Sequence, residues 1–151
     1  MAADNFRTKI TASINRLDEI VVKYAIQINS APWRSEGCET AYQFIRAALG
    51  QGHEIMRVFF YYDGAYNGLR WMSIPACESV VLRYWTELAV DHGVDLVICV
   101  AAAQRRGLLE KKEAVRLGER DDDLAEGFRI GGLGLWVEAC LKSDRFLEFG
   151  A

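Results

Sequence analysis

The sequence predicts a single α/β domain, in which a mostly parallel sheet of about five strands is flanked by helices in a flavodoxin-like or related doubly wound arrangement. Strand-like apolar runs alternate with helical patterns along the 151 residues, and this alternation is typical of parallel sheets. The run Leu96–Val100 is continuously apolar, as in a strand buried on both faces. A chain of this length can bury the core that such a domain needs.

An N-terminal amphipathic extension is predicted over residues 1–22, ahead of the domain at residues 23–151. Apolar side chains recur here at steps of three or four residues, the period of one helix face. They are Phe6, Ile10, Ile14, Leu17 and Val21. Such a helix packs on its own domain or on a partner.

Two strands around a helix are expected in the first half of the domain. Lys23–Asn29 and Glu54–Tyr62 contain the β-branched and aromatic residues that favour strands. Between them, Ser35 is placed to cap a helix that continues to Gly50. Ala65–Ala76 is then expected to be a long loop, a kind of segment that often carries functional residues.

The second half continues the alternation. The predicted segments are a helix over Ala76–His92, the strand Leu96–Val100, a helix over Leu108–Leu117, a short strand Phe128–Ile130, a helix over Leu135–Lys142 and a last strand Arg145–Phe149. Three glycines within Gly131–Gly134 are expected to form a tight entry to the last helix.

Composition and charge argue against several function classes. The net charge of −3 gives no general attraction for nucleic acid, and no apolar run approaches the roughly 20 residues of a membrane helix. Charged residues interrupt the N-terminus from Asp4 to Glu19, so no signal peptide is expected and the predicted location is cytoplasmic. Four cysteines without a CxxC pair and two histidines argue against a structural zinc site.

Cys99 is the candidate reactive residue. It lies where the strand Leu96–Val100 ends, and in open parallel sheets chemistry collects just beyond the carboxyl ends of the strands. Neighbouring backbone N–H groups and the guanidinium groups of Arg105 and Arg106 would favour a thiolate there. From spacing alone, the alternative is a buried cysteine that acts as a small apolar side chain, with both arginines facing solvent.

Three further residues have two interpretations each, and a fourth, Cys140, has one. Asp63, directly before Gly64, either points toward the same crevice or serves only the turn. Cys38 and Cys77 lie near predicted helix starts, where a thiol is either reactive or inert, and Cys140 lies on an apolar helix and is expected in the core.

Four blocks of sequence carry a resemblance to a known family: KYAIQIN, AYQFIRAALGQGHEIMRVFFYYDGAYN, HGVDLVICVAAAQRRG and FRIGGLGLWVEACLKSDRFLEFG. With these blocks in family order and spacing, the chain resembles the DsrE/TusD family of small sulfurtransferases from Lys23 almost to its end. The AAAQRRG run and the YYDG turn favour the DsrE branch.

The resemblance implies a cytoplasmic sulfurtransferase in which Cys99 carries sulfane sulfur as a persulfide. An upstream persulfide donor would load it, and a DsrC- or TusE-like protein would accept the sulfur. DsrF- and DsrH-like subunits, or TusC- and TusB-like ones, would join it in a heterohexamer. The pathway would be dissimilatory sulfur oxidation, or tRNA 2-thiouridine synthesis for a TusD-like chain. Exchange at sulfur needs no metal or organic cofactor, and no direct nucleic-acid or membrane contact is implied.

The chain departs from the family at its N-terminus and in its extra thiols. The family chain usually begins near Val22, and a valine start codon there would leave Met1–Val21 outside the protein made in the cell. Cys38 and Cys77 match no family role.

Two other functions stay open from the residues. A non-catalytic subunit would scaffold a complex through the aromatic segment Tyr66–Trp71. A nucleotide or flavin binder would use the glycines of Gly131–Gly134, which lack the usual spacing and position for a phosphate cradle.

Overall fold

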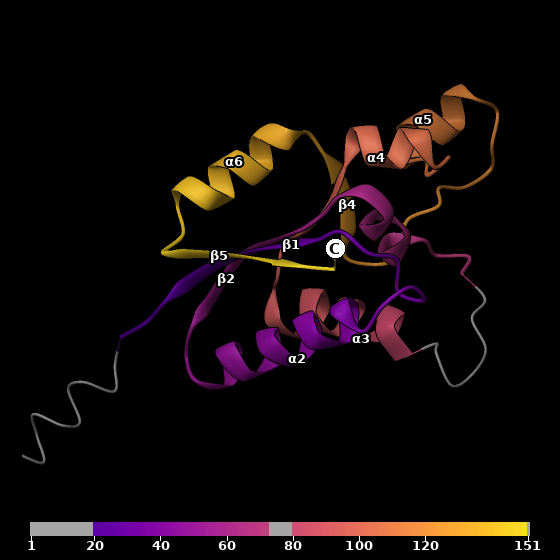
Figure 1. Cartoon of the computed structure of the whole chain (residues 1–151). Helices are drawn as coiled ribbons and strands as arrows, with labels where there is room; N and C mark the ends of the chain where they lie inside the picture. Colours follow the sequence, from indigo (N-terminus) through magenta and orange to yellow (C-terminus); the bar gives the residue numbers. More distant parts are fainter. Residues whose placement is uncertain (1–19, 73–79, 151) are drawn as a thin grey trace, which may run out of the picture.

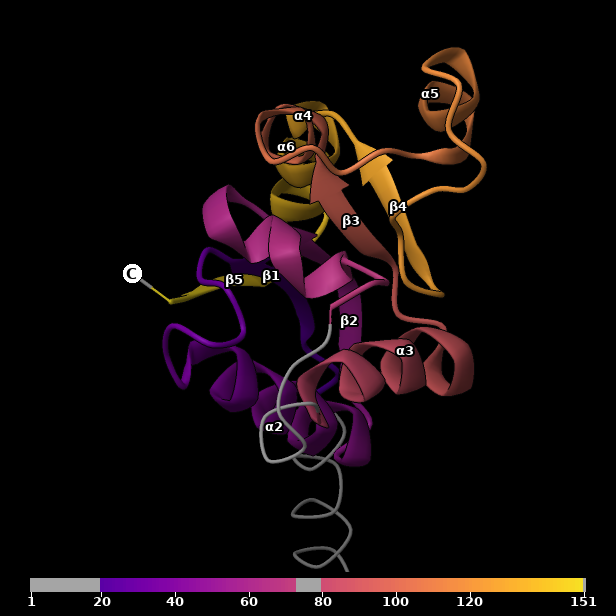
Figure 2. The same cartoon turned by 90° about the vertical axis from the view of Figure 1, so that its right-hand side faces the viewer.

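The computed structural model describes residues 20–72 and 80–150, and within them five strands form one sheet with helices on both faces (Figures 1 and 2). The strand order is β4-β3-β2-β1-β5, and every neighbouring pair is parallel. The strands are β1 (Lys23–Ile28), β2 (Glu54–Phe60), β3 (Leu96–Cys99), β4 (Phe128–Gly131) and β5 (Arg145–Phe149). The predicted parallel α/β sheet is therefore confirmed.

The helices divide between the two faces of the sheet. In Figure 1, α2 and α3 lie below the sheet, whereas α4, α5 and α6 lie above it. Their bounds are α2 (Gly37–Gly50), α3 (Val80–His92), α4 (Val100–Arg105), α5 (Lys111–Arg116) and α6 (Leu133–Leu141). A 3₁₀ helix, η1 (Tyr62–Gly68), follows β2. None of the described helices is long and apolar enough to cross a bilayer.

Two adjacent residues of β2 show how both faces are filled. Successive side chains of a strand point to opposite faces, and Phe59 and Phe60 are both fully buried. The Phe59 ring stacks on Trp136 of α6 at 5.9 Å between centroids, and Phe60 meets the edge of Trp85 of α3 at 5.1 Å. The continuous apolar pattern of the strands follows from this two-sided packing.

A buried arginine ties the sheet to α6. The Nε of Arg57 donates to Asp95 at 2.6 Å, and its Nη1 donates to the carbonyl of Leu135 at 2.6 Å and to Glu138 at 3.2 Å. Arg129 donates two further hydrogen bonds, of 2.8 Å each, to Asp95. Burial alone would raise the pKa of Asp95, but the hydrogen bonds from Arg129 and Arg57 outweigh it and hold that pKa below its usual range.

Several predicted boundaries need correction. The helix expected to be capped by Ser35 begins at Gly37, although the Ser35 hydroxyl still accepts a hydrogen bond from the N–H of Gly37 at 3.3 Å. The predicted helix Leu108–Leu117 is reduced to α5, since the N–H of Leu109 bonds to the carboxylate of Asp123 instead of entering a helix. The last helix begins two residues early, at Leu133, so that the third glycine of the cluster lies in its first turn.

Most of the predicted N-terminal extension, and the thiol of Cys77, lie outside the described residues. The structure begins at residue 20, two residues before the predicted extension ends, and Cys77 lies in the interval 73–79. The predicted start of the helix at Ala76 lies in the same interval, and α3 is described from Val80.

Candidate functional site

Cys99 is the last residue of β3 and directly precedes α4. It pairs with Gly131 at the carboxyl end of β4, so it lies at the strand end where the sequence places it. Only 3% of its surface is exposed. Both interpretations of the sequence therefore describe part of its position: the thiol is buried, and it also lies at the carboxyl-terminal end of the parallel strands.

Outside the sheet, both α4 and η1 contact β3. The predicted loop Ala65–Ala76 is thus wrong in its first part, where the YDGAYNG segment forms η1. Gly64 allows this close approach, because a Cβ at that position would lie 2.0 Å from the carbonyl oxygen of Ile28. The chain enters η1 through Tyr62, whose φ of 42° lies in the left-handed region that a bulky side chain seldom adopts.

Asn67 fixes η1 on the core. Its side chain is 1% exposed, and its Nδ2 donates to the carbonyls of Ser30 at 3.1 Å and Gly64 at 2.9 Å. Its Oδ1 accepts a hydrogen bond of 3.0 Å from the indole Nε1 of Trp85. This one amide therefore joins η1, the segment after β1 and α3. Asn67 gives no sign of this role in the sequence, because a polar residue in a glycine-rich segment is typical of an exposed loop.

Arg106 is brought together with Asp63, and Arg105 is not. The guanidinium of Arg106 donates to one carboxylate oxygen of Asp63 from Nε at 3.1 Å and from Nη2 at 2.6 Å. Its Nη1 donates to the carbonyl of Ala102 in α4 at 3.1 Å, and the group lies 5.8 Å from the centroid of the Tyr66 ring. Arg105 is exposed, and within the described residues no carboxylate lies within ion-pair distance of it. Asp63 thus serves more than the turn.

A polar cavity of about 430 Å³ opens beside this ion pair, at the carboxyl ends of β1, β2 and β5. Acidic, basic and uncharged residues all line it. They are Asn29, Ser30, Arg34, Tyr62, Asp63, Arg106, Glu148 and Gly150. Most of these groups already bond to one another, since Arg34 lies 3.4 Å from Asp63 and the amide of Asn29 donates to Glu148. Cys99 does not line this cavity.

The other described thiols lack the features of a reactive site. Cys38 is fully buried near the start of α2, and its thiol donates to the carbonyl of Ser30 at 3.3 Å. Burial raises the pKa of Cys38, although hydrogen bonds with Ser30 and Asn67 oppose this effect. Burial also raises the pKa of Cys140, which is partly exposed on α6 instead of lying fully in the core as expected.

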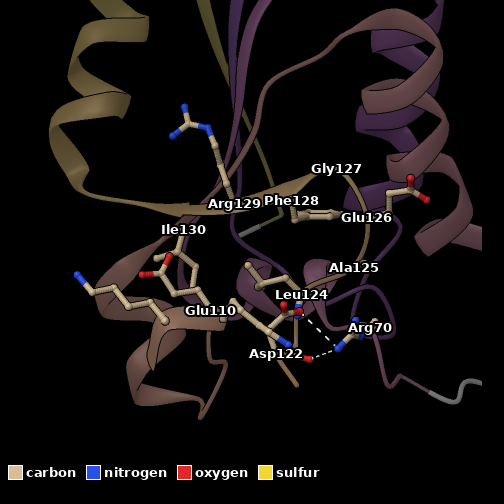
Figure 3. Close-up of a pocket in the computed structure, with 12 residues that line it drawn as sticks. Arg70, Glu110, Asp122, Leu124, Ala125, Glu126, Gly127, Phe128, Arg129 and Ile130 are labelled. Carbon is tan, nitrogen blue, oxygen red and sulfur yellow. Dashed lines mark hydrogen bonds and ion pairs between the residues drawn. The ribbon is translucent and has the colours of Figure 1, made fainter. Parts of the chain in front are cut away.

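A larger cavity of about 730 Å³ lies along β4 and the start of α5 (Figure 3). Arg70 at its rim forms ion pairs with Asp121 at 3.0 Å and Asp122 at 3.4 Å. Cys99 does not line this cavity either. The predicted glycine cluster is also absent from its lining, and a Cβ at Gly131 would lie 2.4 Å from Leu135, so close packing explains this glycine without a phosphate. In the described part of the chain, no group of three or more His, Cys, Asp or Glu side chains could hold a metal ion.

Comparison with known proteins agrees with this architecture. The DsrE/DsrF-like family matches residues 22–149. The chain belongs to this family. A putative sulfurtransferase DsrE of Allochromatium vinosum is 46% identical over 129 residues, which cover 85% of this chain and 99% of the relative. The sulfurtransferase TusD of Salmonella newport is 42% identical over 128 residues, which cover 85% of this chain and 100% of the relative. The predicted DsrE/TusD resemblance is thereby confirmed.

The fold of this DsrE/DsrF-like chain also has a solved counterpart. The ychN protein from E. coli superposes with a TM-score of 0.69 over 85% of this chain and 100% of its own, at 22% identity. At that identity the likeness supports the fold alone. The family match begins at residue 22, so residues 1–21 precede it.

Proposed function

We propose that this DsrE/DsrF-like chain is a sulfurtransferase that carries sulfane sulfur as a persulfide on Cys99 and passes it to an acceptor protein. The observation that carries the proposal is the position of this thiol at the carboxyl end of β3, directly before α4. Two relatives that align along their whole length are named sulfurtransferases, which supports sulfur transfer as the activity.

The chemistry consists of two exchanges at sulfur. The Cys99 thiolate attacks the outer sulfur of a donor persulfide, the donor's S–S bond breaks, and the donor leaves as a thiolate. An acceptor thiolate then attacks the outer sulfur on Cys99, and the Cys99 thiolate leaves. Neither exchange needs an external oxidant, and both are favoured when the attacking and leaving sulfurs are stabilised as anions.

Two features near Cys99 support such stabilisation. The start of α4 has no side-chain cap, and the N–H groups at a helix start favour a negative charge beside them. Arg105 adds an exposed positive charge at the end of the same helix. The charge of Arg106, in contrast, is already balanced by Asp63.

The burial of Cys99 supports a protein partner, because a thiol that is 3% exposed reacts only when the covering elements move. We propose a DsrC- or TusE-like acceptor, an upstream persulfide donor and a heterohexamer with DsrF/DsrH-like or TusC/TusB-like subunits. Dissimilatory sulfur oxidation is the favoured pathway, because the AAAQRRG and YYDG segments resemble the DsrE branch of the family. A TusD-like role in tRNA thiolation is the second candidate, since a relative named TusD is 42% identical.

Intact mass after brief incubation with inorganic polysulfide tests the carrier role. We expect the wild type to gain one sulfur atom, Cys99→Ser to gain none, and the control Cys38→Ser to load like the wild type. Loading that persists in Cys99→Ser would refute the assignment of Cys99. Failure of the wild type to load would favour a scaffold subunit, unless the assembled complex with its partner subunits takes up sulfur.

A further inference from the structure

The outer side of α6 carries large apolar side chains that are exposed. Leu133 and Val137 are each 50% exposed, and Leu141 is 81% exposed. The three are spaced four residues apart, so they form one stripe along the helix. Glu138 is the one charged residue within α6. A helix with so few charges is typically covered on more sides than the one that packs on its own sheet.

Phe146 of β5 adds to this apolar surface. Phe149 packs on Phe44 of α2, with 6.1 Å between the ring centroids. Because successive side chains of a strand point to opposite faces, Phe146 points to the other face, the one that carries α6 (Figure 1). Phe146 is 65% exposed. Leu133, Val137, Leu141 and Phe146 together are named the α6–β5 face.

The helices on this face of the sheet leave room for one more. A parallel sheet is normally covered by helices on both faces. Here α6 contacts β1 and β2, and α4 contacts β3 and β4. β5 pairs with the outer edge of β1, and the exposure of Phe146 shows that β5 lacks such a cover within the described residues. An additional helix beside α6 would complete this layer.

The segment that precedes the described chain ends close to this face. The N–H of Lys23 donates to the carboxylate of Asp144 at 2.8 Å, and the N–H of Asp144 donates to the carbonyl of Lys23 at 2.9 Å. Ile20 precedes Lys23 by three residues, and Leu141 precedes Asp144 by three. Three residues of chain span at most about 11 Å. The end of α6 and the start of β1 therefore lie at the same end of the sheet, as Figure 1 shows.

The length and the apolar pattern of residues 1–19 fit this position. A helix of 19 residues is about 28 Å long, about twice the length of α6. Phe6, Ile10, Ile14 and Leu17 recur at steps of three or four residues, which places them on one side of such a helix. The family match begins at residue 22, so this segment is additional to the matched domain.

We propose that residues 1–19 pack as a helix beside α6 and cover the α6–β5 face of their own chain. Phe6, Ile10, Ile14 and Leu17 then face Phe146 and the exposed stripe of α6. Because residue 20 lies near this face, the segment meets the face of its own chain at a high effective concentration, which favours it over a second copy. Subunits of the same fold are then joined through other surfaces. The proposal is independent of the role of Cys99.

Photocrosslinking of the full chain tests this contact. Phe146 is replaced by the photoreactive analogue benzoylphenylalanine, and crosslinked tryptic peptides are identified by mass spectrometry. We expect a crosslink within the monomer to the peptide of residues 10–16. Replacing Ile10 and Ile14 together by aspartate should reduce its yield by about tenfold or more, because two apolar side chains lose their burial. The matched control replaces Thr8 and Ala12 by aspartate, which adds the same charge on the opposite side of the helix and should preserve the yield.

Two further positions for the photoreactive residue complete the test. Leu141 should give the same intramolecular crosslink, whereas Val90, which is exposed on α3 across the sheet, should not. Absence of a crosslink from both Phe146 and Leu141 to residues 1–19 overturns the proposal. A crosslink between two chains, seen as a dimer on a denaturing gel, overturns it in favour of an interface between copies. An equal loss of yield in the Thr8 and Ala12 control also overturns it, because the apolar side of the segment would then not decide the contact.

Discussion

Replacing Asn67 by alanine should destabilise the fold by about 2–6 kcal/mol, because the buried indole N–H of Trp85 loses its described partner and two backbone carbonyls each lose a hydrogen bond. The indole N–H of Trp85 and the carbonyl of Gly64 each bond to the Asn67 amide. The carbonyl of Ser30 keeps a second donor, the thiol of Cys38. The orphaned indole N–H costs about 1–3 kcal/mol and each of the two lost hydrogen bonds about 0.5–1.5 kcal/mol, so the total is about 2–6 kcal/mol.

Urea unfolding followed by tryptophan fluorescence measures this loss. With a slope of about 2 kcal/mol per molar urea, the midpoint of the Asn67→Ala variant should fall by about 1–3 M. Gln43→Ala is the matched control, since this exposed amide of α2 bonds only to Glu39 within the described chain, at 2.8 Å. The control should stay within about 0.5 kcal/mol of the wild type. A loss below about 1 kcal/mol in a folded Asn67→Ala protein would refute the assignment of Asn67 as the anchor of η1.

Three further predictions concern other parts of the fold. Gly64→Ala should lower the thermal midpoint sharply or prevent folding, because the new Cβ would lie 2.0 Å from a carbonyl oxygen of β1; a midpoint like that of the wild type, by calorimetry, would contradict this. Because the pKa of Asp95 is lowered in the folded state by Arg129 and Arg57, its contribution to stability is present above the unfolded pKa of about 3.9 and is lost as the pH falls through the lowered value. The acid limb of a stability–pH profile should therefore be flatter in Asp95→Asn than in the wild type, and equal slopes would count against this role. Cys38 should resist alkylation at neutral pH until the chain unfolds in urea, and rapid labelling of the native protein would contradict the burial of this thiol.

The strands were the most predictable part of the fold. The segment Arg145–Phe149 is a strand with the bounds that the sequence predicts, and Lys23–Asn29 and Glu54–Tyr62 differ only at their carboxyl ends. Runs of buried apolar residues carry a strong local signal, because the sheet is covered on both faces. The position of Cys99 at a strand end follows from the same signal.

The segment between β2 and α3 was less predictable, for a physical reason. Its glycines and polar residues are typical of loops, yet Tyr62–Gly68 is a helix because distant groups hold it. Asn67 bonds to Ser30, 37 residues away in sequence. Asp63 pairs with Arg106 in the same way, so the sequence could place both near a crevice but not against each other.

The pairing of β5 with β1 also affects how the chain is made. β1 is the first of the described strands to be synthesised, and one of its edges remains open until β5 has been synthesised, because the two strands pair across more than 100 residues of sequence, with Lys23 bonded to Asp144 121 residues away. Pairing between such distant segments is slow to form and leaves strand edges exposed during folding. The sheet, and with it the polar cavity to which Glu148 contributes, therefore cannot be completed on the ribosome until nearly the whole described chain has been translated.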